Sequence, residues 1–192
     1  MDRQVYNFIA PHLIKNNLEI EFRFGKKNGN YFDTNIGKET YDKVYRRLMK
    51  YPSWDAVKHQ RALVYHGTRK GLRIVYDEDT DEQTVISKYN AANMDMNLDG
   101  QKFDVRIAVS IENPATYDTE KDRFPIVKKR VRTSFIRKGL SIDLSVVENE
   151  DKDSENPYVY RLELEVLDPK EQNNVTIANH FHKVFDVLKL FE

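Results

Sequence analysis

The stretch LEIEFRF, residues 18–24, alternates apolar side chains with charged ones. Glu19, Glu21 and Arg23 occupy every second position, and aliphatic or aromatic residues stand between them. Because successive side chains of an extended chain point to opposite faces, the stretch predicts a strand with one apolar face and one face that carries two acids and a base. On a single strand this pattern is typical of the solvated face of an antiparallel sheet.

The same alternation recurs further along the chain. In YRLELEV, residues 160–166, Arg161, Glu163 and Glu165 share one face, and in KKRVRTSF, residues 128–135, the alternate positions are basic. The polar faces of the strands between these segments and within them carry Arg73, Asp104, Arg106, Ser110, Glu112, Lys128, Arg130, Arg132, Ser141, Asp143, Ser145 and, less regularly placed, Lys88.

The hydrophobic spacing predicts a mainly β (α+β) domain. A short helix limited by Pro11 is expected at the start, and two amphipathic helices are expected at 38–50 and near the end of the chain, with apolar positions from Ala178 to Phe191. Residues 90–101 and the acidic stretch 148–157, which we expect to be mobile, predict loops. The expected strands are 18–24, 60–66, 70–77, 83–89, 102–112, 126–136, 139–148 and 158–167.

Two arrangements fit these strands. If the charged faces point outward, they form the solvated side of a sandwich, and their ion pairs contribute ~0–1 kcal/mol each. If they point inward, they line a closed barrel whose apolar outer face is covered by the helices. The inward arrangement is favoured because three amphipathic helices need an apolar surface to cover.

The composition narrows the possible functions. The 192 residues suit one domain, and 31 basic against 31 acidic side chains do not indicate a uniformly basic nucleic-acid surface. The chain has no cysteine, which excludes disulfides, zinc–thiolate sites and cysteine nucleophiles. It also lacks a secretory signal and any apolar run of membrane-spanning length, so a soluble, intracellular protein is expected.

A charged lumen predicts a particular chemistry. Buried charges are costly, so such a bore must hold water, ions and an anionic ligand. Clustered carboxylates without cysteine or clustered histidine select Mg²⁺ or Mn²⁺, held here by Glu19, Glu21 and one acid of the last strand. The remaining carboxylate can orient an attacking water. The cations that could clamp phosphates are Arg73, Lys88, Arg130 and Arg132.

These motifs resemble a known family. EIEFRFG, followed far downstream by YRLELEV, is similar to the two glutamate strands of the triphosphate tunnel metalloenzymes. DVRIAVSIE, RVRTSF and SIDLS resemble in particular the metal-dependent RNA triphosphatases of fungal, protist and large DNA virus mRNA capping, above all the N-terminal domain of giant-virus (mimivirus-like) capping enzymes. The resemblance covers residues 18–166.

The resemblance implies a closed eight-stranded antiparallel β-barrel that removes the γ-phosphate from the 5′-triphosphate end of nascent mRNA, with additional hydrolysis of nucleoside triphosphates in manganese. It implies Glu19, Glu21 and Glu165 as metal ligands and Glu163 as the carboxylate that positions water. It matches Arg73, Lys88, Lys128, Arg130 and Arg132 to basic positions that hold phosphates or stabilise the transition state, and Glu112, Asp143 and Ser145 to residues that support them. We expect Arg73, Lys88, Arg130 and Arg132 to be catalytic, and Lys128, Arg106, Arg23 and Arg161 to bind substrate. For Arg23 and Arg161, neutralisation of neighbouring glutamates across strands is an equal alternative.

The sequence departs from the fungal pattern at Ser141, where that pattern has a base, and at Arg161, where it has an acid. Other hypotheses are a tripolyphosphatase or cyclase of the same fold, or a non-catalytic module that binds RNA ends or polyphosphate. We also expect residues 1–192 to be one triphosphatase domain that continues into a guanylyltransferase, in a viral protein of the virion or the cytoplasmic virus factory. A monomer and a homodimer are both compatible with the sequence.

Overall fold

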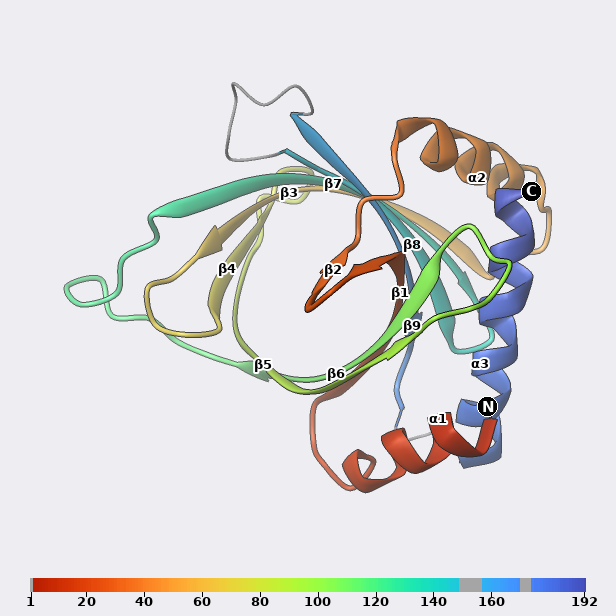
Figure 1. The fold of residues 1–192 in the computed structure, drawn as a ribbon. Helices are drawn as coiled ribbons and strands as arrows, with labels where there is room; N and C mark the ends of the chain where they lie inside the picture. Colours follow the sequence, from red (N-terminus) through yellow and green to blue (C-terminus); the bar gives the residue numbers. More distant parts are fainter. Residues whose placement is uncertain (1, 149–156, 170–173) are drawn as a thin grey trace.

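A computed structural model gives the structure of residues 2–148, 157–169 and 174–192 (Figure 1). Within these ranges the helices are α1 (Asp2–Ile9), α2 (Lys38–Lys50) and α3 (Asn174–Leu188), with short 3₁₀ turns at Ala10–His12 and Lys189–Phe191. The strands are β1 (Leu18–Asn28), β2 (Tyr31–Asp33), β3 (Ala56–His66), β4 (Leu72–Asp77), β5 (Gln83–Met96), β6 (Asp104–Pro114), β7 (Ile126–Arg137), β8 (Leu140–Glu148) and β9 (Tyr158–Val166).

Eight of the strands close into a barrel. Neighbours pair antiparallel in the order β1-β6-β5-β4-β3-β7-β8-β9, and β9 pairs back onto β1. The short β2 is added to the far end of β1 as a hairpin. The predicted eight-stranded antiparallel barrel is therefore confirmed.

The charged faces point into the barrel. Residues directly opposite each other on paired strands share a face, and Glu21 of β1 stands opposite Glu165 of β9. Phe22 and Phe24, which alternate with the charged residues of β1, are completely buried on the outer face. There the ring centroid of Phe22 lies 6.1 Å from that of Phe181 in α3. The inward arrangement is confirmed, because the apolar residues of β1 form the core between barrel and helices and do not fill the lumen.

The helices cover one side of the barrel. Figure 1 shows α1, α2 and α3 on the side of β1, β8 and β9, away from β4. Farther from the helices the outward-facing valines of β7 stay exposed: Val127 by 46% and Val131 by 40%. The expectation that helices cover the apolar outer face thus holds for part of the barrel only.

The prediction of a loop at 90–101 was wrong for its first half. Strand β5 continues to Met96, across a register shift between Asn90 and Ala92. A bulge of this kind inserts one residue and reverses the alternation of faces, which hides the strand in the sequence pattern. The loop predicted at 148–157 lies almost wholly at residues 149–156, outside the described residues.

None of the helices in the described ranges has the length and apolar character needed to cross a bilayer.

The glycine that follows EFRF is explained by the β1–β2 hairpin. A Cβ at Gly25 would lie 2.0 Å from the carbonyl oxygen of Asp33 and 2.7 Å from the Phe32 ring. Phe32 in turn lies under the guanidinium of Arg106, 4.8 Å from ring centroid to Cζ. Strand β2 therefore folds closely over this end of the barrel, and only glycine leaves room for it.

Replacing Gly25 by alanine should displace β2 and lower the free energy of unfolding by about 1–3 kcal/mol, the usual cost of overpacking. Thermal and urea unfolding measure the change. Gly67→Ala is the control, because the three atoms nearest to its Cβ belong to the side chain of Leu72, at 3.1–3.2 Å, whereas the Cβ of Gly25→Ala would overlap a backbone oxygen. Equal stability losses in the two variants would contradict the close approach of β2.

Candidate active site

Three glutamates meet where β1 and β9 close the barrel. One carboxylate oxygen from each of Glu19, Glu21 and Glu165 lies within 4.8 Å of the other two. Glu19 and Glu21 are two residues apart on β1, and β9 brings in Glu165 directly opposite Glu21. The geometry follows from strand alternation and from the closure of the barrel.

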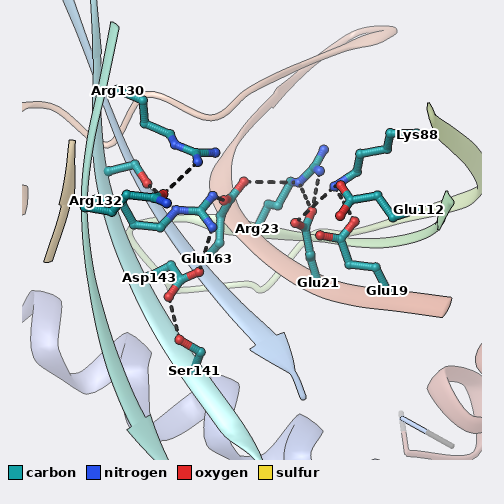
Figure 2. Close-up of polar contacts among 12 residues, drawn as sticks. Glu19, Glu21, Arg23, Lys88, Glu112, Arg130, Arg132, Ser141, Asp143 and Glu163 are labelled. Atoms are coloured by element: carbon teal, nitrogen blue, oxygen red, sulfur yellow. Dashed lines mark hydrogen bonds and ion pairs between the residues drawn. The ribbon is translucent and has the colours of Figure 1, made fainter. Parts of the chain in front are cut away.

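Lys88 of β5 reaches into this cluster. Its ammonium forms an ion pair with Glu19 and lies 3.5 Å from Glu21 and 3.4 Å from Glu112 of β6 (Figure 2). The burial of Lys88 opposes its charge, but the three carboxylates outweigh this effect and raise its pKa. Lys88 thus offsets part of the negative charge, and the structure brings it together with the acids despite its irregular place in the sequence pattern.

The acids of the cluster differ in their proton affinity. Burial, followed by the charge of Glu21, raises the pKa of Glu19 to about 8, and burial together with Asp143 and Glu21 raises that of Glu165 to about 7. Burial also opposes ionisation of Glu21, but Arg23 and Lys88 prevail and lower its pKa to about 2. Near neutral pH, Glu21 is therefore charged. Glu19 and Glu165 can each hold a proton there, and they can release these protons when a cation binds.

The donor set fits a hard divalent cation. The three groups offer carboxylate oxygens, and the ligand atoms are close enough to share one ion. The pKa values of Glu19 and Glu165 report an excess of negative charge and burial that a divalent ion would relieve. Mg²⁺ and Mn²⁺ both match this chemistry.

Arg23 and Arg132 hold Glu163 between them. Arg23 donates from Nε to Glu21 Oε2 over 2.8 Å and lies 3.3 Å from Glu163 Oε1. On the other side, Arg132 Nη2 lies 3.7 Å from Glu163 Oε2. Glu163 is therefore fixed by two guanidinium groups beside the acid cluster, which suits a carboxylate that orients a small molecule.

Asp143 and Ser145 of β8 support Arg132. Asp143 Oδ2 lies 3.2 Å from Arg132 Nη1, and Arg132 Nε donates to Ser145 Oγ over 3.2 Å. Ser141 donates to Asp143 Oδ1 over 2.5 Å, so both oxygens of this buried carboxylate are engaged. These contacts fit the supporting roles that the resemblance implied for Asp143 and Ser145.

Arg130 has a different environment from Arg132. Its Nη2 donates to Gln60 Oε1 over 3.0 Å, and its Nε is buried without a hydrogen-bond partner among the described residues. Burial, followed by repulsion from Arg132, lowers its pKa to about 10, so it stays charged at neutral pH. Sequence reasoning missed Gln60, because the next lumen positions on β3, Ala62 and Val64, are apolar like Leu63 on the outer face, so the strand shows no alternation of polarity.

The strand register places the other predicted cations at lumen positions. Lys128 stands opposite Val64, Arg73 opposite Ile86, and Arg161 opposite Ser145. Arg161 also has a buried Nε without a hydrogen-bond partner in the described part of the chain. Contact of these three cations with substrate stays a prediction.

Arg106 lies at the β2 end of the lumen and is already engaged. It forms two hydrogen bonds with Asp95, from Nε over 2.6 Å and from Nη2 over 3.0 Å, and it stacks on Phe32. Asp95 belongs to the part of β5 that was predicted as a loop, so its pairing with Arg106 could not be foreseen. The contact of Arg106 with substrate also stays a prediction.

A groove of about 720 Å³ lies outside the barrel between α2, α3 and the β7–β8 hairpin. Trp54, Phe135 and Ile142 are among its mainly apolar lining residues. The acids and bases described above are absent from this lining, so the ionic chemistry belongs to the lumen.

Comparison with known proteins gives a family whose activity fits the barrel and its charged lumen. The closed barrel, with carboxylates at one place and guanidinium groups beside them, suits a metal-dependent phosphohydrolase. Residues 26–192 match the family described as mRNA capping enzyme, beta chain, and the chain belongs to this family of mRNA triphosphatases. It is therefore an RNA 5′-triphosphatase of mRNA capping.

Solved structures share the fold at low sequence identity. The S. pombe RNA triphosphatase Pct1 superposes with a TM-score of 0.81 at 15% identity, over 99% of this chain and 91% of Pct1. Pct1 in complex with the Spt5 CTD gives 0.79 at 15% identity, over the same shares. The Mimivirus capping enzyme triphosphatase gives 0.69 at 16% identity, over 97% of this chain and 96% of that one. No curated protein matches the chain in sequence.

The proton affinities generate a prediction for the metal-free protein. Glu19 and Glu165 have pKa values of about 8 and about 7 against 4.5 for an ordinary glutamate, so the folded state binds their protons more tightly than the unfolded state does. Their contribution to stability is present at low pH and is lost as the pH rises from about 4.5 through about 8. Mn²⁺ should therefore raise the melting temperature more at pH 8.5 than at pH 6.

Differential scanning fluorimetry with and without Mn²⁺ measures this effect. The control is Glu165→Gln, which removes one titrating ligand and should reduce both the metal-induced shift and its pH dependence. A shift of the same size at both pH values would contradict the assignment.

Proposed function

We propose that the chain hydrolyses the bond between the β–γ bridging oxygen and the γ-phosphorus of 5′-triphosphate RNA, with a divalent metal ion held by Glu19, Glu21 and Glu165. The products are orthophosphate and an RNA 5′-diphosphate end. The observation that carries the proposal is the cluster of three carboxylate oxygens within 4.8 Å, beside an array of partly buried guanidinium groups. Either Mg²⁺ or Mn²⁺ is the proposed metal, and Mn²⁺ is proposed to support hydrolysis of free nucleoside triphosphates as well.

Each group has a role that its contacts support. When bound, the metal would polarise the terminal phosphoryl group and offset charge in the transition state. Glu163, held by Arg23 and Arg132, would accept a hydrogen bond from the attacking water and orient it. Arg130 and Arg132 would donate to phosphate oxygens, and Lys88, already among the carboxylates, is close enough to share its charge between ligands and phosphate.

The reaction also implies a partner. A diphosphate RNA end is the substrate of a guanylyltransferase, which we propose as the enzyme that acts next. Covalent continuation into that enzyme, the extent 1–192 for the triphosphatase domain and a viral origin stay predictions.

Phosphate release from RNA labelled at the γ-position tests the activity. Wild-type protein should release label only with Mg²⁺ or Mn²⁺, and Glu21→Gln and Glu165→Gln should each lower kcat/KM by about 100-fold or more, because each removes a charged ligand. Glu120→Gln is the matched control, since Glu120 is exposed in a loop far from these strands in sequence. Full activity in either ligand variant would exclude the proposed metal site, and bound but uncleaved RNA in the wild type would indicate a binding module.

A further inference from the structure

We infer that Gln60 is a positioning residue that aims Arg130 at an anionic substrate while leaving the positive charge of Arg130 unneutralised. The inference rests on the proposed function, because it concerns how the lumen holds phosphate. Gln60 lies on the lumen face of β3, directly opposite Arg132 of β7.

Gln60 is the middle member of a hydrogen-bonded chain. Its Oε1 accepts from Arg130 over 3.0 Å, and its Nε2 donates to Asp77 Oδ2 over 2.8 Å. The other oxygen of Asp77 accepts from the backbone N–H groups of Asp79, over 2.9 Å, and Thr80, over 3.1 Å. The turn after β4 therefore fixes Asp77, which fixes the amide of Gln60 and, through it, Arg130.

The chemistry of the two neighbours sets the orientation of the amide. An ionised carboxylate only accepts and a guanidinium only donates, so the NH₂ group must face Asp77 and the carbonyl must face Arg130. A glutamate at this position would repel Asp77 and neutralise Arg130. An apolar side chain of similar size would satisfy neither neighbour.

The neutral amide distinguishes Arg130 from Arg132. Arg132 lies within 4 Å of two carboxylates, Asp143 and Glu163, whereas the hydrogen bond described for Arg130 goes to an uncharged oxygen. The buried Nε of Arg130 still lacks an acceptor in the described residues. A guanidinium that is held in place and partly desolvated, with a donor to spare, binds a phosphate oxygen without losing further side-chain entropy or an existing ion pair.

Two substitutions separate positioning from general structural support. Gln60→Glu should weaken binding of inorganic tripolyphosphate, measured by calorimetry, and raise KM for triphosphate RNA by about tenfold, because a carboxylate would compete with the substrate for Arg130. Gln60→Met should lower kcat/KM by about tenfold through loss of orientation. In an Arg130→Ala background, Gln60→Met should have no additional effect, since the residue acts through Arg130.

Arg61→Gln is the matched control. Arg61 is the next residue on β3, and its exposed side chain pairs with the side chain of Asp79. Asp77 is held instead by the backbone N–H groups of Asp79 and Thr80, so Arg61→Gln removes a surface contact and leaves every link of the chain in place. It should leave KM and tripolyphosphate affinity unchanged. Melting temperatures of all variants show whether a loss of binding follows from unfolding. If Gln60→Met does not fold, the nearly isosteric Gln60→Glu alone tests the inference.

Unchanged tripolyphosphate binding and unchanged KM in a folded Gln60→Glu variant would overturn the inference, as would equal effects of Gln60→Met with and without Arg130. The binding measurement does not depend on catalysis. A wild-type protein that binds tripolyphosphate but releases no phosphate would therefore defeat the proposed hydrolysis, while the comparison of variants would still decide the role of Gln60.

Discussion

The pairing of the first barrel strand with the last is the contact on which the site depends. It places Glu21 opposite Glu165 and Arg23 opposite Glu163, so a pair of like charges adjoins a pair of opposite charges. Like charges directly opposite each other destabilise a strand pair. The repulsion is relieved by a proton on Glu165 or by nearby cations, which Lys88 and Arg23 supply in part and which a divalent ion would supply more fully.

A polar lumen also determines where the stability of the domain must come from. Small barrels are usually filled by apolar side chains, but here the inward positions of β1, β7 and β9 are charged. The apolar core lies outside the barrel, where Phe22, Phe24 and Leu164 pack with Phe181 and Val184 of α3. In the described residues, the main apolar core therefore lies between the outer face of the barrel and the helices. The lumen residues do not have to form the core, so they can be charged.

The sequence predicts a strand and its site residues well where apolar residues occupy one face and charged residues the other. In β1 and β9 every outward residue near the site is apolar and every inward one is charged, so both the strands and their acids could be assigned before the structure was known. The eight-stranded closure came from the resemblance to a family, because alternation alone fitted either a sandwich or a barrel. Strand β3 carries Ala62 and Val64 inward and Leu63 and Tyr65 outward, so Gln60 gave no signal. The bulge in β5 concealed Asp95, and with it the pairing that engages Arg106.

Arg161, where the sequence departs from the fungal pattern, changes the balance of charge in the lumen. Arg161 lies four residues from Glu165 on β9, about 13 Å along an extended strand. It stands opposite Ser145, the residue that also accepts a hydrogen bond from Arg132. An acid there would neutralise part of the charge of the neighbouring arginines, whereas an arginine adds further positive charge. Arg161 therefore adds positive charge beside Arg132, where Asp143 and Glu163 already supply two carboxylates, and it makes this part of the lumen more favourable to an anion than an acid would.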